Sequence, residues 1–98
     1  MTQFMIDIQL PSNPDKEFFT LIPSQRDHID KLLEQGVVLG YSLANDRSRL
    51  WVTLSARDQR EAVEVLTAFP MFSYFEPTIY PLAFHNSSLV SILKVSLN

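Results

Sequence analysis

The sequence predicts an α+β fold in which two helices cover one face of a four-stranded antiparallel sheet, the ferredoxin-like βαββαβ arrangement. Two observations lead to this fold class. Segments that alternate apolar and polar residues are interleaved with helical periodicity in the order strand, helix, strand, strand, helix, strand. The 98 residues are 46 % hydrophobic and 19 % charged and include only two glycines, which suits one globular domain with a thin core.

We expect this domain to occupy residues 1–88. Residues 89–98 are rich in leucine and β-branched residues, and they are too apolar to be a loose end. We expect them to form a β-rich extension that adds a strand or lies against a neighbouring subunit. The alternative is that they fold back onto the helices of their own chain.

The first strand is predicted at residues 3–10, where apolar and polar side chains alternate. A helix follows from Pro14 to about Gln35, because Asn13 suits the N-cap position and proline suits the first helical position. Gly36 is expected to cap the C-terminus of this helix, a position where glycine is common.

The hydrophobic stripe of this first helix contains a polar residue. Apolar side chains recur at helical spacing on one face, and Gln25 falls in the middle of that face, between Phe18 and Leu32. A buried amide needs a hydrogen-bond partner or an adjoining cavity. Pro23 lies inside the helix and should kink it or split it into two pieces.

A hairpin is predicted next, with strands at residues 37–43 and 48–55 joined at the Asn45-Asp46 turn. Ser55 and Asp58 then resemble a capping box that opens the second helix. Pro70 ends that helix, and the last strand is expected at about residues 74–82.

Composition argues against several functional classes. The chain has no cysteine, which removes disulfides and thiolate metal sites and fits a cytoplasmic protein. A net charge of −3 offers no broad positive field for nucleic acid, and no apolar run approaches a membrane span. The two histidines lack metal-ligand spacing, and no glycine-rich phosphate loop is present. We therefore expect no metal and no cofactor.

The sheet face that the helices leave open is predicted to be covered by a second copy of the chain. Its first-strand residues, Gln3, Met5, Asp7 and Gln9, are too mixed for a dry core. Trp51 would lie on the same face, which is too apolar for bare solvent. Two copies that meet through these faces would enclose a partly polar cavity, so we expect a homodimer with an inter-sheet pocket.

The closing part of the sequence resembles a known family. The run FPMFSYFE at residues 69–76, followed by Leu82 and His85-Asn-Ser-Ser, is similar to the closing motif of the muconolactone Δ-isomerase family. That family reads Leu-Pro-Leu-Phe-Pro-Tyr-Met, then a strand, a leucine and His-Pro-Ser-Ser. Residues 10–11, Leu-Pro, and Gly36 also match family landmarks.

The resemblance spans nearly all of residues 3–89 and implies a dimeric α+β barrel, often assembled into rings of dimers. It also implies an isomerase that moves a double bond within a small unsaturated lactone carboxylate. Such a reaction needs a base near the working pH, hydrogen-bond donors for the dienolate and a cation for the carboxylate.

The chain departs from the family at the positions that carry this chemistry. The family's helix glutamate aligns with Gln25, and glutamine cannot act as a base. The family's Leu-Trp-Arg run aligns with residues 41–43, Tyr-Ser-Leu, and its Tyr-Ala-Asn-Tyr run aligns with residues 48–51, Ser-Arg-Leu-Trp. The scaffold and His85 are retained.

Three polar residues are candidates for the site, each with a simpler alternative. Gln25 either orients a ligand or is a buried amide satisfied by the backbone or water. Asp7 either replaces the missing base or is a carboxylate at a wet interface. Arg49 either replaces the missing cation or faces solvent beside the hairpin turn.

Three further residues are candidate ligand contacts. Trp51 is either a cavity wall or part of the dimer core. Tyr41 stands where the family's Leu-Trp-Arg run begins. His85 either contacts ligand or holds the corner at residues 86–88 by hydrogen bonds.

The leading hypothesis is a family member that binds a small organic molecule, with altered proton-transfer chemistry of the isomerase type. The alternative is a non-catalytic assembly or binding module that kept the fold. Fold alone does not decide between them.

Overall fold

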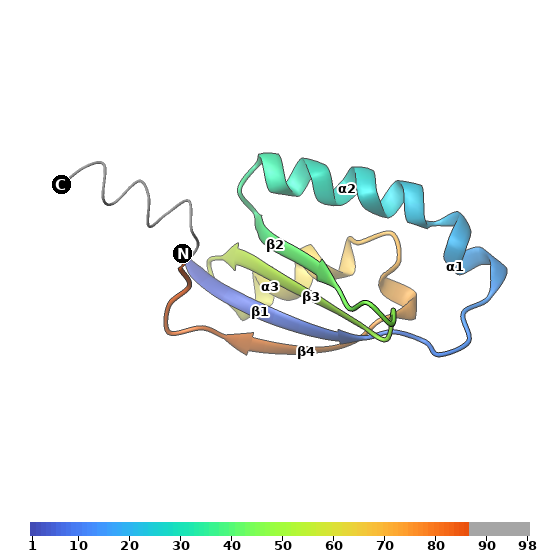
Figure 1. The fold of residues 1–98 in the computed structure, drawn as a ribbon. Coiled ribbons are helices and arrows are strands. Elements are labelled where there is room, and N and C mark those ends of the chain that lie inside the picture. The colour runs from blue at the N-terminus through green and yellow to red at the C-terminus, as the bar shows by residue number, and fades with distance from the viewer. Residues whose placement is uncertain (87–98) are drawn as a thin grey trace.

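The computed structural model describes residues 1–86, and the predicted extension at 89–98 and the Ser87-Ser88 corner lie outside this range. The sheet has four strands in the order β2-β3-β1-β4, and every neighbouring pair is antiparallel (Figure 1). This confirms the predicted α+β class. The elements are β1 (Thr2–Gln9), α1 (Lys16–Thr20), α2 (Ile22–Glu34), β2 (Val38–Leu43), β3 (Arg49–Ala56), α3 (Gln59–Thr67), the 3-10 turn η1 (Phe72–Tyr74) and β4 (Glu76–Pro81).

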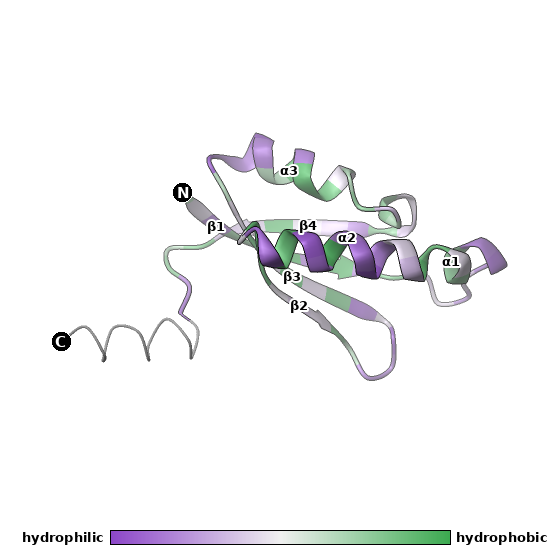
Figure 2. Cartoon of the chain, turned by 90° about the horizontal axis from the view of Figure 1, so that it is seen from above, coloured by the Kyte–Doolittle hydropathy of each residue, from purple (hydrophilic) through white to green (hydrophobic). Residues whose placement is uncertain are grey.

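The register of the central strands assigns their side chains to two faces. In β1, Phe4, Ile6 and Ile8 are buried, and their partners in β3 are likewise buried. Ile29 of α2 and Leu66 of α3 complete this core, so both helices cover the same face. In Figure 2, hydrophobic and hydrophilic residues alternate along α2 and α3, as amphipathic helices require.

The predicted first helix is two helices. Leu21 ends α1 and precedes α2, so Pro23 falls in the first turn of α2, where no N–H is needed for an intrahelical bond. The predicted N-cap at Asn13 is wrong. Asp15 takes that position because its Oδ1 accepts the N–H of Phe18 at 2.9 Å, and the helix begins two residues after Pro14.

Two other predicted boundaries also shift. Ser55 does not open α3, because β3 continues past it to pair with the start of β1. Asp58 is the cap, and its Oδ1 accepts the N–H of Glu61 at 2.9 Å. β4 begins at Glu76, since the preceding residues form the 3-10 turn η1.

The second face of the sheet has no covering element among residues 1–86. It contains Asp7, Arg49 and Trp51, together with Tyr80, which is 52 % exposed. Within the same range, none of the helices combines the length and the apolar character needed to span a bilayer.

Candidate functional site

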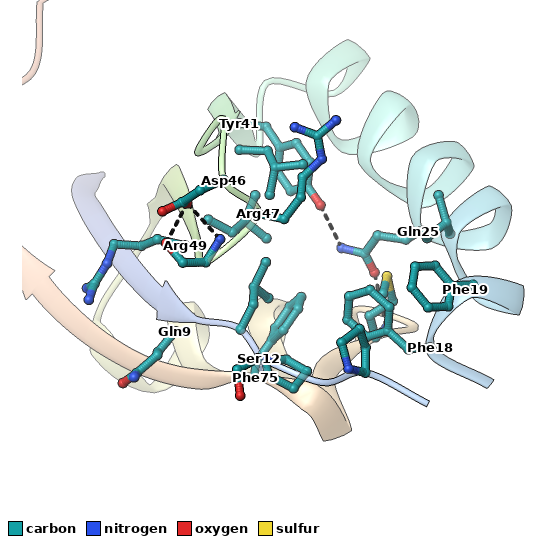
Figure 3. Close-up of a pocket in the computed structure, with 18 of the residues that line it drawn as sticks. Gln9, Ser12, Phe18, Phe19, Gln25, Tyr41, Asp46, Arg47, Arg49 and Phe75 are labelled. Carbon is teal, nitrogen blue, oxygen red and sulfur yellow. Dashed lines mark hydrogen bonds between the residues drawn. The ribbon is translucent and has the colours of Figure 1, made fainter. Parts of the chain in front are cut away.

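A pocket of about 680 Å³ opens at the C-terminal end of β1, on the helix side of the sheet (Figure 3). Four parts of the chain enclose it: the segment after β1, the helices α1 and α2, the β2–β3 hairpin and the segment around η1. Its lining residues are Gln9, Leu10, Pro11, Ser12, Pro14, Phe18, Phe19, Ile22, Gln25, Arg26, Tyr41, Leu43, Asp46, Arg47, Ser48, Arg49, Leu50, Met71 and Phe75.

Aromatic side chains form one wall of the pocket, and a hydrogen bond outside it supports them. Phe18 contacts Phe19 and Tyr74 edge to face, with ring centroids 5.4 and 5.3 Å apart. The Tyr74 hydroxyl donates to Asp15 Oδ1 at 2.8 Å, which raises the pKa of Tyr74 to about 12. The Phe18 N–H and the Tyr74 hydroxyl both lower the pKa of Asp15, so one carboxylate caps α1 and anchors η1.

Gln25 is almost fully buried and joins three parts of the fold. Its Oε1 accepts the backbone N–H of Met71 at 3.1 Å, and its Nε2 donates to the Tyr41 hydroxyl at 3.2 Å. The buried amide therefore has the partners that its place in the helical stripe demands. These bonds tie α2 to β2 and to the segment before η1.

Tyr41 reaches the pocket from β2. It pairs in register with Val52, whose side chain is buried under the helices, so Tyr41 also points to the helix side. Burial raises the pKa of the Tyr41 hydroxyl, with an opposing effect from the Gln25 hydrogen bond and from the charge of Arg26. The hydroxyl is therefore protonated at neutral pH.

The β2–β3 hairpin supplies charged groups at the pocket rim. Asp46 Oδ1 accepts from the Ser48 hydroxyl at 2.6 Å and from the Ser48 N–H at 3.0 Å, and these bonds lower the pKa of Asp46. Arg47 adopts a left-handed conformation with φ 65°, which costs energy for a residue with a Cβ. Its Nη1 donates to the backbone carbonyl of Asn45 at 2.8 Å, so the guanidinium is held at the hairpin turn, and the side chain lines the pocket (Figure 3).

The structure separates the predicted site residues into two groups. Gln25 and Tyr41 meet in the pocket, whereas Asp7 and Trp51 lie on the opposite face of the sheet. Arg49 borders the pocket, but its guanidinium points away (Figure 3) and pairs with Asp7, with 2.7 Å between Nη1 and Oδ1. The pocket found within one chain lies on the helix side, whereas the predicted chamber between two sheets requires a second copy and stays a prediction.

His85 lies far from this pocket. It follows β4, and the end of β4 pairs with the start of β1, whereas the pocket adjoins the end of β1. The predicted corner that His85 would hold includes residues 87 and 88, which lie outside the described range.

Several pocket residues were not predicted from the sequence. Arg26 lies four residues after Ile22 on α2, so the i,i+4 spacing of a helix could have suggested it. Arg47 stands one residue after the predicted Asn45-Asp46 turn, but a turn does not show where a long side chain will reach. The Met71 contact comes from a backbone N–H, which has no sequence signal. Among residues 1–86, no group of three acidic, histidine or cysteine side chains could hold a metal ion.

Comparisons with known proteins identify the fold and the family. The family model described as muconolactone delta-isomerase matches residues 3–88, which confirms the resemblance seen in the closing motif. A search of curated proteins returned no match. A crystal structure of muconolactone isomerase superposes with a TM-score of 0.69 at 18 % identity, covering 89 % of this chain and 94 % of that chain.

A second solved structure has the same fold. It is the 5-chloro-2-hydroxyhydroquinone dehydrochlorinase from Burkholderia phenoliruptrix AC1100, in complex with 2,5-dihydroxybenzoquinone. The TM-score is 0.60 at 12 % identity, over 85 % of this chain and 95 % of that chain. At such identities, both likenesses concern the fold alone.

Proposed function

Because the chain belongs to the muconolactone delta-isomerase family, we propose that its helix-side pocket binds a small unsaturated organic molecule with an anionic oxygen. The observation that carries this proposal is the pocket itself. Gln25, which aligns with the family's base, lies at this pocket and is hydrogen-bonded to a second lining residue, Tyr41.

The size and lining of the pocket suit such a ligand. About 680 Å³ lies within the range of small-molecule sites. Phe18, Phe19 and Phe75 offer flat apolar surfaces for an unsaturated ring, and Arg26 and Arg47 supply positive charge for an oxyanion or carboxylate. The related dehydrochlorinase structure, which contains 2,5-dihydroxybenzoquinone, is an example of this ligand chemistry on the same fold.

The lining favours binding and anion stabilisation over the family's proton abstraction from carbon. An amide replaces the base at Gln25. Of the described residues that line the pocket, Asp46 alone has a carboxylate, and its hydrogen bonds to Ser48 make it a weak base. A proton-transfer reaction in this pocket would therefore differ from the family's isomerisation.

We also propose that two copies associate through the open sheet face. Trp51 is 38 % exposed there and Tyr80 is 52 % exposed, which is a large aromatic surface for a monomer. Trp51→Lys should shift sedimentation velocity from dimer to monomer, whereas Val63→Lys, on exposed α3, should not. If the wild-type chain sediments as a monomer at working concentration, the homodimer proposal is wrong.

Calorimetric titration with 4-nitrophenolate and 2,5-dihydroxybenzoquinone tests the binding function. Leu43→Asp places a negative charge at the pocket and should weaken binding at least about tenfold, since one charge contact changes affinity by more than about 1.4 kcal/mol. Leu39→Asp introduces the same charge in the same strand outside the pocket lining, and should bind as wild type does.

Two outcomes would contradict the binding function. One is that neither compound binds to wild type, and the other is that both variants weaken binding equally. The first result, together with a stable dimer, would support the alternative of a non-catalytic assembly module.

A further inference from the structure

The orientation of the Gln25 amide is fixed by its contact with Met71. The backbone N–H of Met71 can only donate, so the atom that faces it at 3.1 Å must be the amide oxygen, Oε1. The amide nitrogen, Nε2, therefore faces the Tyr41 hydroxyl at 3.2 Å. An amide nitrogen only donates, so Tyr41 must accept.

The hydrogen bond that Tyr41 accepts from Gln25 determines the direction of the Tyr41 hydroxyl hydrogen. A tyrosine hydroxyl has a single hydrogen and lone pairs on the oxygen. Because a lone pair receives the Gln25 N–H, the hydrogen points away from Gln25. Among residues 1–86, no group accepts a hydrogen bond from it, and Tyr41 lines the pocket (Figure 3). A donor is thus left for whatever occupies the pocket.

Charges around the Tyr41 hydroxyl favour an anionic acceptor. Arg26, next to Gln25 on α2, exerts its positive charge on Tyr41, and Arg47 lines the same pocket from the hairpin, where its guanidinium donates to the Asn45 carbonyl at 2.8 Å. The opposing charge in the lining is Asp46, whose carboxylate is bound by Ser48. Arg49 is paired with Asp7 on the other face of the sheet.

We propose that Tyr41 donates its hydroxyl hydrogen to an anionic oxygen of the ligand, and that Gln25 is the positioning residue that aims this hydrogen into the pocket. This inference rests on the proposed binding function and names the ligand class: an enolate, phenolate or similar conjugated oxyanion. Tyr41 is then the specificity-determining contact that distinguishes the ionised ligand from its neutral form.

Replacing Gln25 with glutamate would reverse the arrangement. A carboxylate at this position would still accept the Met71 N–H, but it would also accept the Tyr41 O–H. The Tyr41 hydrogen would then be turned away from the ligand. Because the two side chains are nearly the same size, Gln25→Glu reverses this hydrogen bond with little change in packing, although the added negative charge also disfavours an anionic ligand. Tyr41→Phe removes the donor without adding a charge.

Absorbance titration of 4-nitrophenol, free and bound to the full chain, measures this preference. If the phenolate binds at least about tenfold more tightly than the phenol, the pKa of the bound probe falls by about one unit. Gln25→Glu and Tyr41→Phe should each abolish that fall. Tyr80→Phe removes a hydroxyl on the open sheet face and should keep it. Circular dichroism confirms that each variant is folded.

The outcomes distinguish a failure of this inference from a failure of the proposed binding function on which it rests. If the neutral analogue 4-nitrotoluene binds but the pKa of bound 4-nitrophenol does not move, the pocket binds ligands and the role of Tyr41 is overturned. If Gln25→Glu keeps the full shift, the positioning role of Gln25 is overturned. If neither compound binds, the binding function fails and this inference fails with it.

Discussion

Polar residues are paired differently on the two faces of the sheet. On the helix side, Gln25 is buried, and its hydrogen bonds to Met71 and Tyr41 leave one hydroxyl hydrogen of Tyr41 toward the pocket. On the open side, Asp7 and Arg49 pair directly, with side chains 29 % and 42 % exposed. The first arrangement leaves a donor for a ligand, whereas the second neutralises its own charges.

This difference indicates which face suits which partner. A pocket with one spare donor and nearby positive charge can recognise a small anion. A flat face with exposed aromatic residues and an internally neutralised ion pair suits another protein surface, since burying it leaves no unpaired charge. The same strands present both surfaces because successive side chains of a strand point to opposite faces.

The largest expected difference between the faces is in stability. Ile6→Ala, in the helix-side core, should lower the free energy of unfolding by about 2–5 kcal/mol, because it leaves a cavity among fully buried side chains. Met5→Ala, on the adjacent open side of β1, should cost clearly less, because Met5 is only half-buried. Urea unfolding measures both, and equal costs would show that the open face is also a core.

The next effect concerns the buried amide. Gln25→Leu removes the partner of the Met71 N–H and should cost about 1–3 kcal/mol, the penalty for a buried unsatisfied donor. Gln35→Leu, at the exposed end of the same helix, should change the stability by no more than about 0.5 kcal/mol. Guanidinium unfolding at one pH compares them. If Gln25→Leu leaves the free energy of unfolding unchanged, the hydrogen bond between Gln25 and Met71 does not hold the pocket together.

A smaller effect is expected from the open-face ion pair. A double-mutant cycle of Asp7→Ala and Arg49→Ala should give a coupling of about 0.2–1 kcal/mol, because both side chains are partly exposed. The coupling should fall as salt is added. A coupling that is large and insensitive to salt would indicate that the pair is buried by a second copy, and dilution of the protein should then reduce it.

The smallest effect concerns the support of the aromatic wall. The folded-state pKa of Tyr74, about 12, lies above its usual value of 10.0, so the Asp15 bond stabilises the fold fully below pH 10. That contribution should disappear as pH rises through about 12. The lowered pKa of Asp15 predicts a second loss as pH falls below its usual 3.8. Thermal unfolding at a series of pH values should show no alkaline loss of stability in Tyr74→Phe. If this variant shows the same pH profile of stability as the wild type, the role given to the Tyr74–Asp15 bond is wrong.

The sequence predicts the fold because the fold depends on periodicity. Alternation in β1 and β3 assigns each side chain to a face, and the helical spacing places Gln25 inside the core before any contact is known. The helix start was misplaced because Asn13 and Asp15 are both good caps, and only the geometry shows which one meets an N–H.

The site was harder to predict than the fold. The sequence singled out Gln25 and Tyr41, which both line the helix-side pocket, but it grouped Gln25 with Asp7 and Trp51, which face the other way. The pairing of Gln25 with Tyr41 depends on the packing of α2 over β2, and the Met71 contact depends on the path of a turn. Neither has a local pattern, so the direction of the Tyr41 hydrogen is visible only in three dimensions.

One measurement tests most directly whether the ligand site is the helix-side pocket or the open face. The chain has a single tryptophan, Trp51, so its indole signal reports on the open face without ambiguity. In a ¹H–¹⁵N spectrum titrated with 4-nitrophenolate, the Gln25 side-chain amide and the Met71 backbone amide should shift while the Trp51 indole stays in place. A shift of the Trp51 indole signal, with the Gln25 and Met71 signals unchanged, would contradict the account.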